Sequence, residues 1–316
     1  MPRGVQMRVG IGVLLTLVLM FSGCTDIIPV SPEQQAVGVI FTKFEPDTRV
    51  VEGTGNEKVE LFLEVKNIGD ALASNVHAEI FNYGTGLAVA PESVGEFSFG
   101  NLEPPVNGVP GERESYSFVF NVVGRELGME DNIDIGARLV YYYDSRGRGE
   151  VTIVPKSEYR AGIPITIAGE GYSSNGPVKV TVHSEQPVIV SDVVDSFSVY
   201  VDLENIGIGR LRSIDHGYDY VDYVDLYVPA GFNVSGYCDF KGDLDMDAGG
   251  IITMDHVSSS TANERLGMVD GKTRKLLCRL RVNSTEIQDS YEFKAIAGYR
   301  YQQDSFTQLQ VHGLED

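Results

Sequence analysis

Two segments of this sequence repeat one pattern, and the duplication limits the folds that the chain can adopt. "LFLEVKNIGDALASNV" begins at Leu61, and "FSVYVDLENIGIGRLRS" begins at Phe197. Each segment opens with alternating apolar and polar residues, which is the pattern of a β-strand with one buried face. Each strand then ends at Asn-Ile-Gly, at 67–69 and 205–207, where asparagine and glycine allow a tight turn. The repeat predicts two copies of one β-rich domain.

The match continues along the chain. "NVHAEIF" from residue 75 corresponds to "YVDLYVP" from residue 223, and "ESYSFVFNV" from 114 corresponds to "RKLLCRLRV" from 274. Near the end of each copy, "ARLVYYYDSRGRGEVTIV" from 137 corresponds to "AIAGYRYQQDSFTQLQV" from 295, and we interpret both as hairpins. The first copy thus has seven predicted strands, at 36–43, 58–66, 75–82, 94–99, 114–123, 133–143 and 149–154.

Short strands separated by Gly, Pro and Asn turns are typical of immunoglobulin-like sandwiches, and no long amphipathic helical segment occurs. We therefore predict an all-β fold with two tandem immunoglobulin-like β-sandwiches, 36–168 and 177–316. Residues 154–177 form the junction, whose Gly and Ser content suggests hinge freedom, and the second sandwich carries an acidic insertion.

The N-terminus has the layout of a secretory signal. Arg3 and Arg8 precede a short apolar run that ends in "FSGC", with Cys24 after two small residues. The run is shorter than a membrane span requires. "FSGC" resembles the lipobox of exported lipoproteins, although Phe21 replaces the usual aliphatic residue, which leaves an archaeal-type signal open. We predict a signal peptide at 1–23, a lipidated Cys24 and a tether at 24–35; a plain secretory signal and an uncleaved anchor are the alternatives.

The first copy also resembles a known family. "LFLEVKNIGDALASNVHAEIF", from Leu61 to Phe81, is similar to CARDB-type (cell-adhesion-related) sandwiches, which occur in tandem in archaeal and bacterial envelope proteins. Together with the lipobox, this resemblance is strongest to archaeal envelope lipoproteins. The second copy lacks the "DALASNV" part. The resemblance implies a structural or adhesive role and supplies no catalytic residues.

The formal charge of −20 argues against a nucleic-acid partner, because a phosphate backbone is bound through clustered Lys and Arg. Enzyme signatures are also missing from the sequence. The five histidines are scattered singly, and neither a zinc-binding His-Glu-x-x-His nor a nucleophile elbow occurs. We predict a protein that is not an enzyme and requires no cofactor.

Three further groups of residues are candidate sites. Cys238 and Cys278 form an even pair in one exported domain, which favours a disulfide over two buried thiols. Asn233 and Asn283 begin Asn-X-Ser/Thr triplets and are candidate glycosylation sites. In the acidic insertion, carboxylates alternate in "DFKGDLDMDAGG", a pattern that Ca²⁺ can use when the backbone turns. These carboxylates are Asp243, Asp245 and Asp247.

The acidic carboxylates do not fit an EF-hand, because Ala248 and Met254 stand where that loop needs Gly and Glu. A solvated acidic loop is therefore favoured over a looser calcium turn. A second Tyr- and Asp-rich segment, 213–227, is interpreted as an edge strand in preference to an exposed binding loop.

These observations together predict an extracytoplasmic protein held at the cytoplasmic membrane by a lipidated cysteine. Its sandwiches would act in adhesion, scaffolding or protein–protein interaction, with other envelope proteins or glycans as partners. The alternative is a calcium-dependent or carbohydrate-binding surface module that uses the acidic loops of the second domain. The oligomeric state is not predicted.

Overall fold

The computed structural model describes residues 37–313, apart from 56, 125–128, 168, 170, 192–195, 214–216, 243, 245–247, 256–265 and 283–287. Residues 35–316 form one compact unit. Nearly every described element is a strand, and the described part holds one short helix, α1 (Lys156–Arg160). No helix in the described part has the length and hydrophobicity that a membrane span requires. The fold is all-β with two immunoglobulin-like sandwiches, as the sequence predicts.

The two sandwiches, here called the first lobe and the second lobe, each have one layer of their own. In the first lobe this layer is a four-stranded antiparallel sheet, with strands in the order β1 (Val39–Pro46), β3 (Lys58–Asn67), β7 (Arg113–Val122) and β5 (Leu87–Val89). In the second lobe the order is β10 (Val178–Ser184), β12 (Ser196–Asn205), β18 (Thr273–Val282) and β16 (Phe232–Cys238). The strands of the two four-stranded sheets occupy equivalent places, which confirms the duplication read from the sequence.

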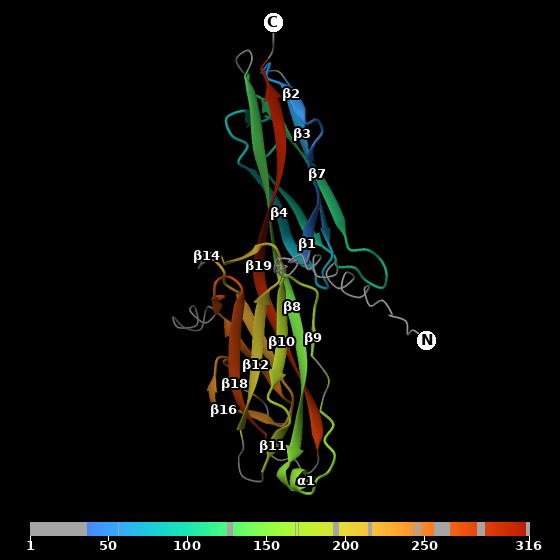
Figure 1. Cartoon of the computed structure of the whole chain (residues 1–316), viewed down its shortest axis with the longest axis vertical. Helices are drawn as coiled ribbons and strands as arrows, with labels where there is room; N and C mark the ends of the chain where they lie inside the picture. Colours follow the sequence, from blue (N-terminus) through green and yellow to red (C-terminus); the bar gives the residue numbers. More distant parts are fainter. Residues whose placement is uncertain are drawn as a thin grey trace, which may run out of the picture. The chain divides into compact units, whose positions relative to one another are not determined.

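The other layer is shared by both lobes. Two long strands, β8 (Glu130–Pro155) and β19 (Asp289–His312), pair antiparallel from Ile153↔Asp289 to Glu130↔His312. We call them the shared strands; Figure 1 shows them, green and red, running side by side through both lobes. Each sandwich therefore contains one half-strand from each sequence copy.

Shorter strands extend the shared sheet on both sides. In the first lobe, β4 pairs with β8, β6 pairs with β4, and β2 pairs in parallel with β19; their bounds are β4 (Ala73–Phe81), β6 (Glu96–Leu102) and β2 (Val50–Glu52). In the second lobe, β15 pairs with both β19 and β17, while β11 and β9 pair with β8; their bounds are β15 (Tyr223–Val228), β17 (Gly250–Asp255), β11 (Val188–Val190) and β9 (Tyr172–Ser173). Near the middle of β19, β13 (Arg210–Ser213) pairs with it and with β14 (Gly217–Tyr218).

The predicted hairpin with strands at 133–143 and 149–154 is wrong, because these residues lie in the single continuous strand β8. The hairpin predicted from residue 295 is wrong as well, because it lies in the continuous strand β19. Gly147 and Gly149, which read as turn residues, lie on the inner face of β8 beneath β10. A Cβ atom on either one would collide with the backbone carbonyl of Val180 or Val182. Glycine is therefore needed for close approach of another backbone and not for a turn.

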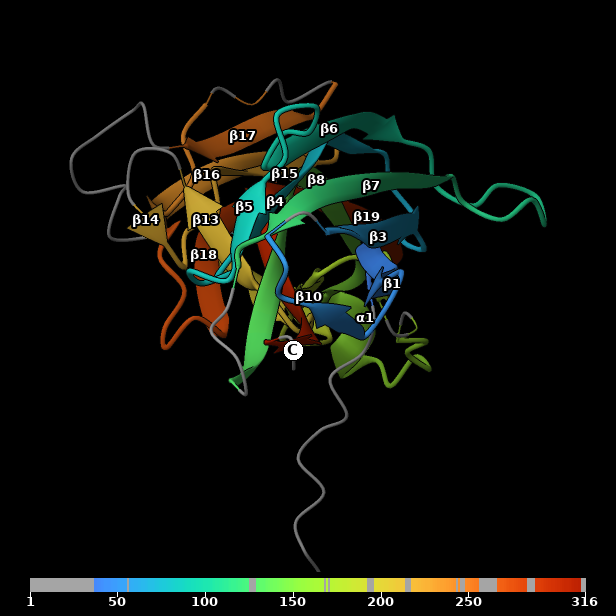
Figure 2. The same ribbon diagram turned by 90° about the horizontal axis from the view of Figure 1, so that it is seen from above.

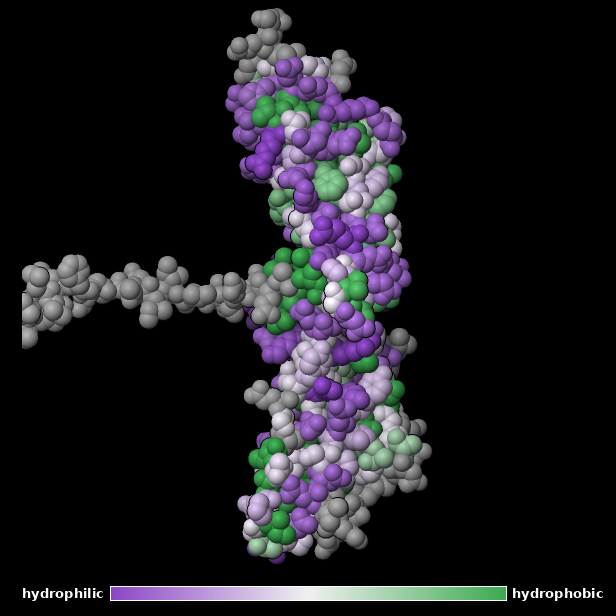
Figure 3. Space-filling model, turned by 90° about the vertical axis from the view of Figure 1, so that its right-hand side faces the viewer, coloured by the Kyte–Doolittle hydropathy of each residue, from purple (hydrophilic) through white to green (hydrophobic). Residues whose placement is uncertain are grey.

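Apolar and polar residues alternate along the strands, and the apolar side chains form the core between the layers. Leu61, Leu63 and Phe118 from the four-stranded sheet of the first lobe are fully buried with Ile135 and Leu139 of β8. Burying each such side chain contributes about 1.5–3 kcal/mol. In the end-on view of Figure 2, β1, β3 and β7 lie together on one side of β4 and β8. Figure 3 shows one side of the exterior, where hydrophobic residues form scattered patches among hydrophilic ones, as is normal for a protein surface.

Candidate binding site on the shared sheet

Four buried tyrosines lie at the centre of the shared strands. Tyr141 of β8 is opposite Tyr301 of β19, and Tyr143 is opposite Tyr299. The ring centroids of the two pairs are 5.8 and 6.3 Å apart, and all four residues are at most 2 % exposed. The tyrosines therefore fill the place where the two lobes meet along the shared sheet.

The hydroxyls of two of these tyrosines occupy equivalent places. The backbone N–H of Val39, at the start of β1, donates to Tyr141 Oη over 3.2 Å. The N–H of Val178, at the start of β10, donates to Tyr299 Oη over 3.0 Å. A residue of β8 thus corresponds to the residue of β19 that is 158 positions later, since 299 − 141 = 158. This relation gives the positions of β8 their counterparts in β19.

The Asn-Ile-Gly turns hold the other two tyrosines. Ala71 N–H donates to Tyr143 Oη over 3.0 Å, and Gly209 N–H donates to Tyr301 Oη over 2.7 Å. Asn67, which is fully buried, donates through Nδ2 to the carbonyl oxygens of Ala71 and Leu102, both over 2.9 Å. The repeated motif is a turn, as predicted, and it also fastens each four-stranded sheet to the shared strands.

A hollow of about 490 Å³ lies on the outer face of the shared sheet in the second lobe. Its lining includes Arg146 and Arg148 of β8, Lys294 of β19, Tyr172 of β9 and Tyr227 of β15. The register places Tyr172, Arg148, Lys294 and Tyr227 in one row across four neighbouring strands. Two tyrosines therefore flank two cations. The lining also includes the Ile296 side chain and the backbone of Gly147 and Ala295, whose Cβ positions face the interior.

Tyr172 is held in place from two sides. Its hydroxyl donates to Asp70 Oδ2 over 3.0 Å, and the guanidinium carbon of Arg148 is 5.2 Å from its ring centroid. Burial and the hydrogen bond to Asp70 raise the pKa of Tyr172. Asp70 also accepts from Asn175 N–H over 2.7 Å, which ties the returning chain to the first Asn-Ile-Gly turn. Tyr172 is thus positioned without any ligand.

The cations of the hollow stand in an otherwise acidic surface. Glu292 lies 3.6 Å from Arg148 and 2.8 Å from Lys294, and the hydrogen bond from Lys294 lowers the Glu292 pKa. Arg146 is exposed, and no carboxylate of the described residues lies within ion-pair distance of it. Asp225, in the same row as Arg146, accepts a hydrogen bond from Thr253 over 2.6 Å. The hollow therefore has a local positive charge on a chain of net charge −20.

The equivalent place in the first lobe is closed. Phe306 and Gly136 correspond to Arg148 and Lys294 through the 158-residue relation, and the ring of Phe81 covers Gly136. Phe81 and Phe306 pack edge to face with centroids 5.7 Å apart. Beside them Arg138 makes a two-pronged ion pair with Asp304, at 3.0 and 3.2 Å. An open cationic hollow is therefore a property of the second lobe only, among the residues that the structure describes.

Sequence reasoning missed this site. The signal was "RGRG", in which Arg146 and Arg148 alternate and so must share one face of a strand. The hairpin interpretation placed them in a turn and hid that consequence. Lys294, Tyr172 and Tyr227 come from distant segments, and only the strand register brings them together.

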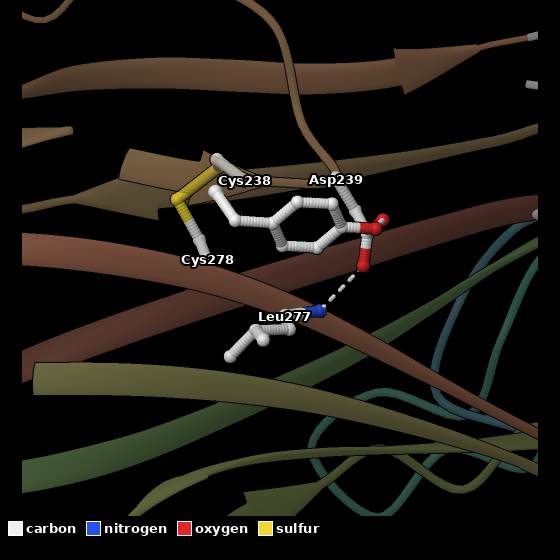
Figure 4. Close-up of a disulfide and its surroundings, with 5 residues drawn as sticks. Cys238, Asp239, Leu277 and Cys278 are labelled. Atoms are coloured by element: carbon white, nitrogen blue, oxygen red, sulfur yellow. Dashed lines mark hydrogen bonds between the residues drawn. A yellow bond between two sulfur atoms is a disulfide. The ribbon is translucent and has the colours of Figure 1, made fainter. Parts of the chain in front are cut away.

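Cys238 and Cys278 are joined by a disulfide between β16 and β18 (Figure 4). Next to it, Leu277 N–H donates to Asp239 Oδ2 over 2.8 Å, and Asp239 N–H donates to the Leu277 carbonyl over 2.8 Å. Tyr237 Oη donates to the other carboxylate oxygen of Asp239 over 2.6 Å. The bond closes the base of the segment that contains the acidic insertion.

Most of the other predicted sites lie outside the described residues: Cys24, Asp243, Asp245, Asp247 and Asn283. Asn233 lies in β16, where it is opposite Arg281. Within the described ranges, no group of three or more His, Cys, Asp or Glu side chains is placed to hold a metal ion.

The edge-strand interpretation of 213–227 is right for β14, which pairs with β13 alone at the end of the sheet, and wrong for the last part of the segment. Its last part forms β15, which pairs with β17 on one side and with β19 on the other, so it is an inner strand. The alternation of Tyr and Asp arises because Tyr223, Asp225 and Tyr227 face outward while Val224 and Leu226 are buried.

Comparisons with known proteins are weak. No family model matches the chain, and no curated protein matches its sequence. Among solved structures, the partial N-terminal region of an enterococcal surface protein covers 83 % of this chain and 92 % of its own, with 8 % identity and a TM-score of 0.17. The collagen binding domain of the Erysipelothrix rhusiopathiae surface protein RspB covers 87 % and 91 %, with 10 % identity and a TM-score of 0.13. At these TM-scores the similarities carry no argument about function.

Proposed function

We propose that the protein acts in adhesion or scaffolding outside the cytoplasmic membrane, and that the hollow of the second lobe is its contact for a partner in the cell envelope. The observation that carries this proposal is the contrast between the lobes. The same place on the shared sheet is filled by Phe81, Phe306 and an ion pair in the first lobe, whereas it is open and cationic in the second. The first lobe has the same sheet without such a hollow, so the fold itself does not require one.

The anchor, the repeat units and the partners are proposed from the sequence. A lipid on Cys24 anchors the chain, the sequence repeat units are 36–168 and 177–316, and the two sandwiches that these units build together are of the CARDB kind. The partners are other envelope proteins or glycans, and the chain performs no catalysis of its own. The disulfide between Cys238 and Cys278 supports an oxidising compartment, because such bonds persist outside the cytosol.

Site-specific cross-linking on intact cells tests the contact. A photoreactive residue at Ile296, on the floor of the hollow, should give discrete cross-linked species. The same residue at Asn101, an exposed position of the first lobe, should not. Adding Arg148→Gln and Lys294→Gln should remove the species formed from position 296. Equal yields from both positions, or yields that the double substitution leaves unchanged, would show that the hollow is not the contact.

The lipid anchor has its own test. The intact mass of the protein from the membrane fraction should show acyl chains on a mature N-terminal Cys24. A mature chain with an unmodified Cys24, or one that retains residues 1–23, would contradict the anchor and leave the partner contact untouched.

A further inference from the structure

We infer that the hollow binds a sugar residue that carries one carboxylate, within a glycan that is otherwise neutral. This inference rests on the proposed function and specifies the chemistry of the partner. Three properties of the hollow support it: the two flanking tyrosines, the cations between them, and the acidic surface that surrounds them.

The rims suit a sugar ring. Tyr172 and Tyr227 stand on opposite sides of Arg148 and Lys294 in a single row, and the floor between them is small and apolar. A pyranose has faces made of C–H groups, which pack on aromatic rings, and an edge of hydroxyls, which needs donors and acceptors. Tyrosine offers both an apolar ring and a polar hydroxyl. An open hollow on a sheet face admits a ring that belongs to a longer chain.

The cations suit a carboxylate. Arg148 presents a guanidinium whose paired N–H donors match the two oxygens of a carboxylate, and Lys294 supplies a second charge from the neighbouring strand. Both already pair with the single carboxylate of Glu292, at 3.6 and 2.8 Å. A ligand carboxylate can therefore join or replace Glu292, while Arg146 remains as an additional partner on the same face of β8.

The surrounding acids exclude a polyanion. Glu150 and Glu292 lie opposite one another, two residues along their strands from Arg148 and Lys294. Asp225 lies in the same row as Arg146, and Asp144 lies two residues before Arg146 on β8. The whole chain has a formal net charge of −20. A nucleic acid or a polyuronate would bring repeated charges against these groups, which costs free energy. A ligand with one negative charge brings no further charges against these acids and competes for the cations with Glu292.

An acidic peptide is the main competing partner, and it shares the carboxylate. A peptide would use the edge of a sheet or pockets for alternate side chains. Here β15 and β19 both have neighbours on each side, and the edge strand beside the hollow, β9, is only two residues long, which is too short to pair with an added peptide strand. The sugar is therefore the better match.

Binding of three probes tests the inference on the chain without its signal peptide: a trisaccharide ending in glucuronic acid, the same trisaccharide ending in glucose, and a short Glu-containing peptide. Titration followed by NMR of the tyrosine ring protons should show that the glucuronic acid probe binds at least tenfold more tightly than the neutral probe and the peptide. Comparable binding of the two trisaccharides would overturn the role of the carboxylate, and tighter binding of the peptide would overturn the assignment to a sugar.

Substitutions locate the binding. Arg148→Gln with Lys294→Gln should weaken the glucuronic acid probe at least tenfold and bring it to the level of the neutral one. The matched control is Lys179→Gln with Lys275→Gln, which removes two positive charges from the four-stranded sheet of the same lobe and should change nothing. Unchanged melting temperatures would show that both variants are folded. If the control weakens binding as much as the test variant, the effect is one of net charge and the site is wrong.

The two proposals fail in different ways. Cross-linking from position 296 that depends on the cations, combined with no binding of the glucuronic acid probe in the millimolar range, would overturn the sugar and retain the partner contact. Loss of both would overturn both.

Discussion

Replacing Asn67 by alanine should cost more stability than the same change at Asn205, the equivalent residue of the second Asn-Ile-Gly turn. The Asn67 side chain is fully buried and makes three hydrogen bonds: it donates to the carbonyls of Ala71 and Leu102 and accepts from Gly69 N–H, at 2.9, 2.9 and 3.0 Å. Alanine leaves all three backbone groups without that partner. An unsatisfied buried group costs about 1–3 kcal/mol, so the loss of three partners is at most about 3–9 kcal/mol. This is a large part of the 5–15 kcal/mol that typically stabilises a folded protein.

The equivalent Asn205 provides the comparison. Its Nδ2 donates to Gly209 and Gly271 over 3.1 and 3.3 Å, its Oδ1 accepts from Tyr301 over 3.2 Å, and the residue is partly exposed. Water can replace part of what is lost, so Asn205→Ala should cost about half as much as Asn67→Ala.

Urea unfolding followed by far-ultraviolet circular dichroism measures both, since the chain has no tryptophan. Asn101→Ala is the control, because the Asn101 side chain is exposed and accepts one bond, from Asn75 N–H over 3.2 Å; it should cost below about 1 kcal/mol. A cost for Asn67→Ala below about 1 kcal/mol, or one no greater than that of Asn205→Ala, would refute the view that the motif fastens the sheets to the shared strands.

Four further outcomes are expected. The two lobes should unfold in one transition by heat or urea, because β8 and β19 belong to both; two separated transitions in calorimetry would contradict this. Alkali should destabilise the protein, because burial raises the pKa of Tyr143 to about 12. The stability that this tyrosine contributes is present below pH ~10 and is lost as the pH rises toward 12, by about 1.4 kcal/mol per pH unit for each such tyrosine. A series of urea titrations at different pH values measures this loss. Tyr143→Phe should reduce that slope. Reduction of the Cys238–Cys278 bond, which spans 40 residues, should cost about 4 kcal/mol, and an unchanged urea midpoint in dithiothreitol would argue against it. Calcium should leave the melting temperature unchanged if the acidic insertion is a solvated loop; a rise that depends on Asp243 and Asp245 would favour the calcium alternative.

Much of the first lobe could be read from the sequence. The predicted strands at 58–66 and 114–123 agree with β3 and β7 within a residue, because strict alternation about a buried face leaves a strand little freedom in register. The short strands β2 and β5 were missed, since three residues carry too little periodicity to be recognised.

The sequence by itself determined the all-β class, the duplication and the positions of the Asn-Ile-Gly turns, because these depend on local alternation and on the backbone preferences of Asn and Gly. Only the tertiary structure decided that β8 and β19 are continuous. Gly147 and Gly149 are equally compatible with a turn and with a strand beneath another backbone, and the choice depends on β10, which lies elsewhere in the chain. The hollow depends on the continuity of β8, which places Arg146 and Arg148 on one face of a strand. Its cations and tyrosines come from β8, β9, β15 and β19, and contacts between distant segments leave no local pattern that a sequence could display.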